Sequence, residues 1–477
     1  MKDATVRLSG ISIKNFKNVK NGEISFQNPR KKYRASILGL YGQNGSGKTA
    51  LIDALQILKN ILCGRKLDPE TADYINVDAE SADLEYVFDI SALDGNYKAY
   101  YECCIRKDYE DTEQNLDHDN SQSKQSKTVI YDEVLSFSFE NADTRIRKSR
   151  FIDTRTAKVF TPSVKYGLLI GNEEKTKMNL LVAKKMAEQT SRSFLFSREL
   201  LGAAKEHGKS QMADAEYSRH MNLLETLIFY GHYELFVINQ ATAGTISMNF
   251  LPLAFKYEDK RTKAAGLTIL PLDKPSVIFK ETVGIVENVI KNMNIVLEQM
   301  VPGLTICIKD LGDEIMENGK AGKRIQLLSC KNSREIPLKY ESDGIKKIVM
   351  ILQLLIAVYN QDSVTVAIDE LDSGIFEYLL GETVRIVSEK GKGQLIFTSH
   401  NLRMLETLDR GFVAFTTTNP SHRYIRMTNV KDNNNLRDYY YRDITLGTDS
   451  QNEQLYEPTH NAEIALAFRE AGEIIVP

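Results

Sequence analysis

A buried-type apolar run leads straight into a glycine-rich loop near the start of the chain. The run is Ser36-Ile37-Leu38-Gly39-Leu40-Tyr41, and the loop is Gly42-Gln43-Asn44-Gly45-Ser46-Gly47-Lys48-Thr49. The apolar run predicts a buried strand. Leucines at helical spacing after the loop predict a helix: Leu51, Leu55, Leu58 and Leu62. The loop fits G-x-x-x-x-G-K-[ST] at every fixed position, with a strand before it and a helix after it, so it predicts a site for ATP with Mg²⁺.

Each residue type in this loop suits phosphate binding. Glycines let backbone N–H groups converge on phosphate oxygens, and the start of the helix adds a favourable dipole. Lys48 would supply a compact positive charge for the β- and γ-phosphates, and Thr49 a hydroxyl ligand for Mg²⁺. The alternative is a glycine-rich turn with an accidental lysine, which the flanking elements disfavour.

Two more apolar strands end in polar side chains in the C-terminal half. Residues 364–368 run into Asp369 and Glu370, and residues 395–397 run into Thr398-Ser399-His400. Open α/β sheets bind ligands at the carboxyl ends of their strands. Asp369 would therefore hold Mg²⁺, Glu370 would act as the general base on the attacking water, and His400 would reach the γ-phosphate. The alternatives are a solvated acidic turn and a surface or capping histidine.

A further phosphate-binding candidate opens the helix predicted for residues 342–359. Ser342-Asp343-Gly344 places a hydroxyl and a glycine at a helix N-terminus, where both hydroxyl and backbone N–H groups can bind phosphate oxygens. The alternative is a plain N-cap, which has the same local geometry and no ligand.

Composition limits the class of protein. The chain has 477 residues, enough for two to four structural units, and a formal charge of -3, which gives no general attraction to nucleic acid. It lacks a long apolar run and an N-terminal leader, so we expect no membrane segment and a cytoplasmic location. The five cysteines form no C-x-x-C pair, and we expect neither a disulfide framework nor a zinc site: Cys63, Cys103, Cys104, Cys307 and Cys330.

Three segments are expected along the chain. Residues 1–165 would form an N-terminal half with the phosphate loop and antiparallel strands at 82–90, 97–105, 129–139 and near Phe151. Residues 166–300 would be a mainly helical insertion, with helices at 178–188, 218–230 and 276–300. Residues 301–477 would complete the fold with strands at 304–309, 324–328 and 394–398, short strands in the tail, and helices at 376–390 and 462–471. The polar stretch 111–127 is expected to be a flexible loop or, less favoured, a partner-binding loop.

The order of these motifs resembles the ABC-clade ATPases. By that resemblance Ser342-Asp343-Gly344 is the signature motif, Asp369-Glu370 the Walker B carboxylates, Leu371-Asp372 the D-loop with Asp372 at the nucleotide, and His400 the switch histidine. The implied fold class is α/β, an ABC-type ATPase head with a mixed central sheet, an antiparallel β lobe and a helical insertion. The long interval between Lys48 and Asp369 is typical of SMC-like and OLD-like ATPases.

Local features resemble the OLD-like group in particular. They are the opening Ile13-Lys14-Asn15-Phe16-Lys17-Asn18, the strand pairs after the first helix, and Asn435-Leu436-Arg437-Asp438-Tyr439-Tyr440 in the tail. Too few residues follow His400 for the Toprim nuclease of OLD proteins. The resemblance therefore implies an ATPase without its own nuclease, as in two-component anti-phage systems such as PARIS and Septu.

The resemblance also implies the partners. In this clade one chain holds half a site, so we expect a homodimer or higher even oligomer in which Ser342 meets the nucleotide held by another copy's Lys48. A separate effector, a nuclease, and a phage-encoded trigger would be further partners; no membrane is involved. The rival functions are an SMC-like or RecF-like DNA-repair ATPase and a nucleotide-gated interaction protein. A basic run would either contact DNA or, as we favour, protect a strand edge: Arg145, Arg147, Lys148, Arg150, Arg155 and Lys158.

Overall fold

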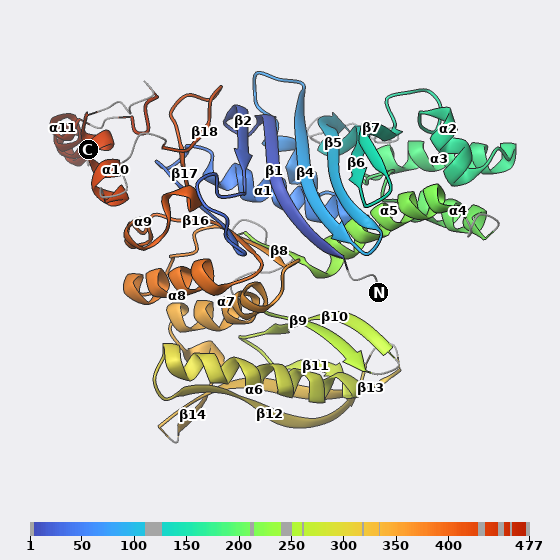
Figure 1. The fold of residues 1–477 in the computed structure, drawn as a ribbon. Helices are drawn as coiled ribbons and strands as arrows, with labels where there is room; N and C mark the ends of the chain where they lie inside the picture. The colour runs from blue at the N-terminus through green and yellow to red at the C-terminus, as the bar shows by residue number, and fades with distance from the viewer. Residues whose placement is uncertain are drawn as a thin grey trace, which may run out of the picture.

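The computed structural model describes residues 4–109, 126–209, 214–239, 250–259, 262–316, 319–332, 334–427, 435–446, 453–457 and 460–473. A mixed six-stranded sheet forms its centre, in the order β18-β17-β3-β16-β15-β8 (Figure 1). All neighbours in this sheet are parallel except β17 and β18. The bounds are β3 Ser36–Tyr41, β8 Leu235–Ile238, β15 Thr365–Ile368, β16 Gln394–Thr398, β17 Val413–Thr416 and β18 Tyr424–Ile425.

The two faces of this sheet support two separate cores. On β3, Leu38 and Leu40 pack into the cluster that contains α1 (Lys48–Leu62), whereas Ile37 and Tyr41 pack into the cluster that contains α7 (Asp343–Asn360). The alternation follows from the two-residue period of a strand. Because both faces are covered by helices, the parallel strands are continuously apolar, as their sequences predicted.

A second six-stranded sheet, wholly antiparallel, forms the β lobe in the order β2-β1-β4-β5-β6-β7. Every second residue of β4 is buried, and Tyr86 on this strand donates a hydrogen bond from its hydroxyl to the Ala54 carbonyl of α1 at 2.6 Å. The strand expected near Phe151 is longer and includes most of the basic run. The bounds are β1 Thr5–Phe16, β2 Val19–Ser25, β4 Ser81–Ala92, β5 Gly95–Tyr109, β6 Ser126–Glu140 and β7 Arg145–Asp153.

A buried glutamine joins the lobe to the central sheet. Gln394, the first residue of β16, accepts hydrogen bonds from the Leu8 backbone N–H at 2.8 Å and from the Thr365 hydroxyl at 2.9 Å, and donates to the Leu8 carbonyl at 2.8 Å. Leu8 belongs to β1 of the lobe. A buried amide with its oxygen and nitrogen both bonded avoids the cost of an unpaired polar group and fixes the two sheets together.

Four helices follow the lobe. The helices predicted at 178–188 and 218–230 are confirmed as α3 (Glu174–Gln189) and α5 (Ala215–Tyr233), and the sequence missed α2 (Ser163–Ile170) and α4 (Arg198–Gly208). The fold class is confirmed, while the boundaries at 165/166 and 300/301 stay predictions. The polar stretch 111–127 lies almost wholly outside the described residues.

The segment expected to be mainly helical also contains four strands. β8 joins the central sheet, and β9 (Phe250–Asp259) and β10 (Thr262–Pro271) form a hairpin. The helix predicted from 276 was wrong at its start, because residues 276–279 form β11 (Ser276–Phe279) and α6 spans Val283–Met300. β11 pairs with β13, and this long-range pairing overrides the local helical pattern.

The predicted strands at 304–309 and 324–328 are confirmed as β12 (Leu304–Ile315) and β13 (Ala321–Lys331), followed by β14 (Arg334–Pro337). Contrary to the expectation for the cysteines, Cys307 on β12 and Cys330 on β13 form a disulfide. The antiparallel register places Thr305 opposite Cys330, so Cys307 lies diagonally across the ladder. Sequence spacing alone could not reveal this proximity.

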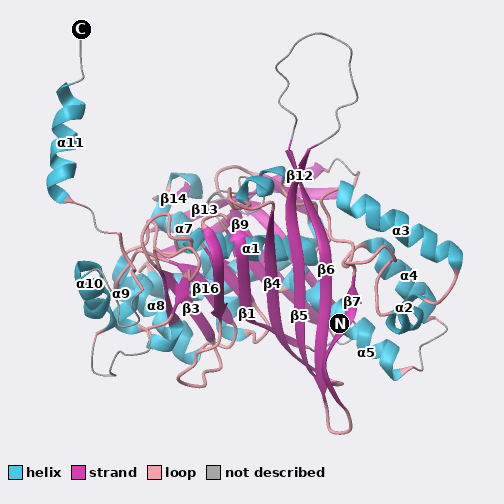
Figure 2. Cartoon of the chain, turned by 90° about the horizontal axis from the view of Figure 1, so that it is seen from above, coloured by secondary structure: helices cyan, strands magenta, loops and turns pink. Residues whose placement is uncertain are grey.

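The helices predicted at 342–359, 376–390 and 462–471 are confirmed as α7, α8 (Glu377–Lys390) and α11 (Asn461–Glu473). The sequence missed α9 (Arg403–Thr407) and, in the tail, α10 (Leu436–Leu446). α11 stands apart from the body, on the side away from α3 (Figure 2). In the described part of the chain, no helix has both the length and the apolar content needed to cross a bilayer.

A buried carboxylate ties the helical segment to the lobe and yields a stability prediction. Glu133 on β6 accepts hydrogen bonds from the Tyr101 hydroxyl (2.8 Å), the Ser193 hydroxyl, and the backbone N–H groups of Phe194 (2.8 Å) and Leu195 (3.2 Å).

We expect Glu133→Ala to lower the free energy of unfolding by about 3 kcal/mol, because it leaves several buried donors unpaired. Chemical denaturation measures this. Glu140→Ala, at the exposed end of the same strand, is the control and should change stability by less than about 0.5 kcal/mol; equal losses would contradict the role of Glu133.

Candidate functional site

Three parallel strands bring the predicted motifs to one edge of the central sheet. β16 lies between β3 and β15, with Leu40 opposite Thr398 and Ile368 opposite Phe397. All three strands run in the same direction, so their carboxyl ends meet. The glycine loop, the Asp369-Glu370 pair and the Ser399-His400 segment therefore lie together, although the sequence separates them widely.

The glycine loop has a backbone that side chains would obstruct. Gly42, Gly45 and Gly47 have φ values of 154°, 75° and 92°. A Cβ atom on Gly42 would lie 1.7 Å from the Thr416 Oγ1 of β17. The Ser46 hydroxyl donates to the Gln43 carbonyl at 2.6 Å and also contacts the Thr416 hydroxyl. The loop is thus held tightly against β17 in a backbone conformation that depends on glycine, as an anion cradle requires.

Lys48 lies inside this cradle. Its Nζ donates to the carbonyls of Gly42 (2.7 Å) and Gln43 (3.0 Å), and its side chain is buried. Burial lowers the pKa of Lys48, and the nearby carboxylates, Asp369 first among them, oppose that shift. The first turn of α1 contains no acidic residue, so its positive end remains free to attract phosphate.

An oxygen-rich pair suited to Mg²⁺ stands beside the loop. The Thr49 hydroxyl lies 3.2 Å from Asp369 Oδ2, and Asp369 Oδ1 accepts a hydrogen bond from the Thr398 hydroxyl at 2.6 Å. Asp369 is only 6% exposed. A hydroxyl and a carboxylate are ligands that Mg²⁺ prefers. Two residues predicted to bind the metal are therefore brought together, and Thr398, which the sequence did not single out, orients one of them.

Two hydrogen bonds fix the backbone of Glu370. Its φ is +46°, uncommon for a residue with a side chain. The Glu370 N–H donates to the Thr398 hydroxyl at 2.7 Å, and its carbonyl accepts a hydrogen bond from Lys347 Nζ of α7. Lys347 is buried, and burial lowers its pKa. Sequence reasoning missed Lys347, because its contact with Glu370 depends on how α7 packs beside the end of β15.

Asp372 and His400 form a second contact at this edge. The His400 backbone N–H donates to the Asp372 carboxylate at 3.2 Å and 3.3 Å, and the His400 side chain is exposed. The proposed D-loop and switch segments therefore meet within one chain. Their exposed location leaves the imidazole available to a ligand or a neighbouring molecule.

The start of α7 lies against the loop that follows the acidic pair. Ser342 caps the helix by accepting a hydrogen bond from the Ile345 N–H at 3.3 Å. A Cβ atom on Gly344 would lie 2.2 Å from the Gly374 carbonyl oxygen, so close packing already requires glycine there. Among the described residues, no hydrogen bond joins Ser342 or Gly344 to the glycine loop. Neither of these two predicted nucleotide-binding residues is therefore joined to its own chain's phosphate loop by a hydrogen bond.

The two ends of the chain brace the glycine loop, which the sequence did not predict. Asn18 donates to the Gly45 carbonyl, and the Tyr424 hydroxyl donates to the Gly47 carbonyl at 2.9 Å. Arg423 bridges the two by donating to the carbonyls of Thr417 (2.6 Å) and Asn18. The only signal was the Asn15-Phe16-Lys17-Asn18 opening, whose chemistry could not be assigned without the fold.

An ion pair extends this brace to the helix after the loop. Lys17 binds the buried Asp53 of α1, and Asn239, at the end of β8, donates to the other oxygen of that carboxylate. Burial raises the pKa of Asp53, while Lys17 and Asn239 oppose the shift. The end of β8 is thereby coupled to the helix that carries Lys48.

The C-terminal tail also touches the glycine loop. The Gln43 side chain accepts from the Glu457 N–H at 2.9 Å. A hollow of about 380 Å³ opens between the loop and the tail, lined by Gly42, Asn44, Ser399, His400, Tyr440 and Tyr456 among others. Aromatic and polar groups thus surround the space in front of the loop.

The first part of the chain matches a known ATPase family. Residues 7–223 match the model of the AAA ATPase domain. No curated protein matches the chain. Solved structures that align include an Smc head domain from Pyrococcus furiosus bound to the C-terminal domain of ScpA (TM-score 0.40, 12% identity, 89% of this chain and 96% of that one). Others are the SMC head domain from Thermotoga maritima (TM-score 0.34, 14% identity, 88% and 99%) and RecF with ATP (TM-score 0.35, 12% identity, 89% and 100%). At these values the structural likeness carries no functional argument.

The glycine loop yields a binding prediction. Gly42→Ala should abolish nucleotide binding, because its Cβ would overlap the Thr416 hydroxyl and displace the loop from β17. Gly45→Ala is the matched comparison: φ there is +75°, but no atom lies within 4 Å of the new Cβ. It should cost only the left-handed strain, of the order of 1 kcal/mol. Titration with a fluorescent ATP analogue measures both. Equal affinities for the two variants would show that contact with β17 does not shape the site.

Proposed function

We propose that this chain binds ATP with Mg²⁺ and hydrolyses it to ADP and phosphate. The observation that supports this most directly is the approach of Thr49 to Asp369 beside the Lys48 cradle. The match of residues 7–223 to an ATPase domain model agrees with it.

In this proposal each residue has a distinct task. The glycine loop and Lys48 bind the phosphates, and Thr49 and Asp369 hold the metal. Mg²⁺, when bound, neutralises charge that develops on the phosphate oxygens. Glu370 accepts the proton of the attacking water, and His400 donates a hydrogen bond to the γ-phosphate. Thr398 positions both carboxylates, through the side chain of Asp369 and the backbone of Glu370.

A second copy of the chain would complete the site. Ser342 and Gly344 make no hydrogen bond to their own glycine loop, and the surface near them carries exposed aromatic side chains: Tyr340 (68% exposed), Phe376 (71%) and Tyr378 (55%). Aromatic residues are enriched in protein interfaces. We therefore propose a head-to-tail homodimer, or a higher even oligomer, in which each glycine loop meets the Ser342 helix of another copy.

The biological role that we propose is that of the ATP-switched scaffold of an anti-phage defence system, which controls a separate effector, a nuclease. ATP would favour the closed assembly and hydrolysis would release it, because only the closed form contacts the nucleotide from both sides. The order of motifs and its resemblance to OLD-like ATPases support this role. Co-purification of the effector with the chain from its native operon would test it.

A second candidate function is that of an SMC-like or RecF-like DNA ATPase. The observation that favours it is a set of exposed basic residues on β7, an edge strand: Arg145, Arg147, Lys148 and Arg150. DNA should then stimulate hydrolysis, and Arg147→Glu should abolish the stimulation but not the basal rate. Hydrolysis that DNA does not change would favour the defence scaffold.

Mixing two inactive variants tests the shared site. Lys48→Ala removes the phosphate contact and Ser342→Arg blocks the facing helix, so each alone should lose hydrolysis. In a mixed dimer one site combines the intact loop with the intact helix, so an equimolar mixture should recover about a quarter of wild-type activity. A phosphate-release assay measures this. Ser91→Arg, at an exposed position on β4, controls for the added arginine and should behave as wild type. No recovery, or full activity of Ser342→Arg alone, would refute a site shared between copies.

Removal of the general base should separate binding from hydrolysis. Glu370→Gln keeps the shape and hydrogen bonding of the side chain but cannot accept a proton, so hydrolysis should fall by about 100-fold or more while ATP affinity is kept. Size-exclusion chromatography should show an ATP-dependent shift to the larger species that persists in this variant. The isosteric Asp369→Asn variant should instead lose the Mg²⁺ dependence of binding. Unchanged turnover in Glu370→Gln would exclude Glu370 as the base.

A further inference from the structure

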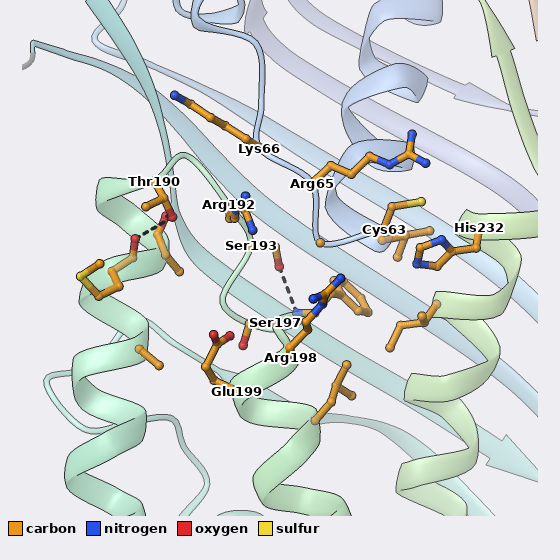
Figure 3. Close-up of a pocket in the computed structure, with 18 of the residues that line it drawn as sticks. Cys63, Arg65, Lys66, Thr190, Arg192, Ser193, Ser197, Arg198, Glu199 and His232 are labelled. Carbon is orange, nitrogen blue, oxygen red and sulfur yellow. Dashed lines mark hydrogen bonds between the residues drawn. The ribbon is translucent and has the colours of Figure 1, made fainter. Parts of the chain in front are cut away.

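A large groove with an apolar wall lies in the helical segment, outside the site described above. It has a volume of about 970 Å³ and is formed by the end of α1 together with α3, α4 and α5 (Figure 3). Apolar side chains line it, among them Leu62, Val182, Met186, Leu201 and Ile228. The nucleotide chemistry uses none of them.

One wall of this groove is an uncovered helix face. Met178, Val182 and Met186 recur every four residues on α3 and are 62%, 57% and 50% exposed. Residues at this spacing lie on the same side of a helix. α3 buries Leu180 and Ala187 and packs Leu181 and Ala183 against the core, and it leaves Met178, Val182 and Met186 exposed. A continuous exposed stripe of this kind marks an interaction site.

Basic side chains surround the groove. Arg65, Lys66, Arg192 and Arg198 are all exposed and stand around it in Figure 3, with Glu199 as the single carboxylate. Within the described parts of the chain, none of these four cations forms an ion pair. The groove therefore favours an occupant with an apolar face and acidic flanks.

The C-terminal helix α11 has an apolar face with acidic residues along one flank. Ile464 and Phe468, four residues apart, are 43% and 78% exposed, and Leu466 is 58% exposed. Glu463 and Glu470 lie together along one flank of the Ile464–Phe468 face, and Arg469 lies along the other flank. The helix has 13 residues and α3 has 16. At about 1.5 Å per residue these lengths are similar, roughly 20 and 24 Å.

In this structure α11 does not lie in the groove of its own chain. α11 and α3 lie at opposite sides of the molecule in both views (Figures 1 and 2). The chain just before α11 is anchored at Glu457, whose N–H donates to Gln43 in the glycine loop. α11 therefore lies away from its own helical segment.

We propose that α11 of one copy binds in the α3 groove of a second copy. Ile464 and Phe468 would pack against Val182 and Met186, and the glutamates of α11 would face the surrounding arginines and lysine. This is helix-in-groove recognition, in which apolar anchors give affinity and charges select the partner. The contact needs no nucleotide and is separate from the shared ATP site proposed above.

Light scattering of the full chain without nucleotide tests the contact. Wild type should self-associate, and Phe468→Glu or Met186→Glu should each weaken association at least tenfold. Neither change should unfold the protein, since both side chains are at least half exposed. Leu93→Glu, at an 88% exposed site outside the groove and α11, is the matched control and should associate as wild type does. A monomeric wild type, or association unchanged in both variants, would overturn the proposal.

A mixture of the two variants identifies the partner. Phe468→Glu retains an intact groove and Met186→Glu retains an intact α11, so the mixture should regain one contact and associate more than either variant alone. Binding of α11 within its own chain predicts no such recovery and would overturn the proposal. Lys48→Ala should leave the association unchanged, so loss of nucleotide binding and loss of this contact are measured independently.

Discussion

The parallel register of β3, β16 and β15 is the constraint on which the site depends. It places residues from the two ends of the chain at one edge of the sheet and sets the distance between Thr49 and Asp369 at 3.2 Å. Parallel strands need long connections, and here those connections contain the β lobe and the helical segment. The site is therefore not a local structure: it exists only when the whole central sheet has formed.

Buried charge around the glycine loop shows how strongly its position is fixed. Lys17 and Asp53 form an ion pair beside the loop, and Lys347 reaches the carbonyl of Glu370. Taking such groups out of water is unfavourable unless each has a partner. The fold supplies those partners from the ends of β1 and β8 and from α7. The phosphate site is therefore surrounded by helices and strands that are joined to each other by hydrogen bonds and ion pairs of charged side chains.

Sequence reasoning was most successful where the local pattern and the tertiary context agree. The glycine loop matches a fixed motif, and the acidic strand and the helix after Ser342 have clear apolar patterns with clear ends. The structure has the predicted element at each of these three places. Sequence reasoning failed where pairing between segments far apart in the chain determines the local structure. β11 reads locally as the start of a helix, and Cys307 and Cys330 become neighbours only through the β12–β13 ladder. The support from Asn18, Arg423 and Tyr424 was invisible for the same reason, because it joins residues from opposite ends of the chain.

Gln394 gives the β lobe a mechanical role. Its amide holds Leu8 of β1 to β16 by three hydrogen bonds with Leu8 and Thr365, all between buried groups. β1 continues to Phe16, next to Lys17 and Asn18, which contact α1 and the glycine loop. The first strand of the lobe is therefore fixed near one end to the central sheet and at the other end to the glycine loop. The lobe and the phosphate cradle share this strand, so a change in the position of β1 must either break one of these attachments or alter the support of the cradle.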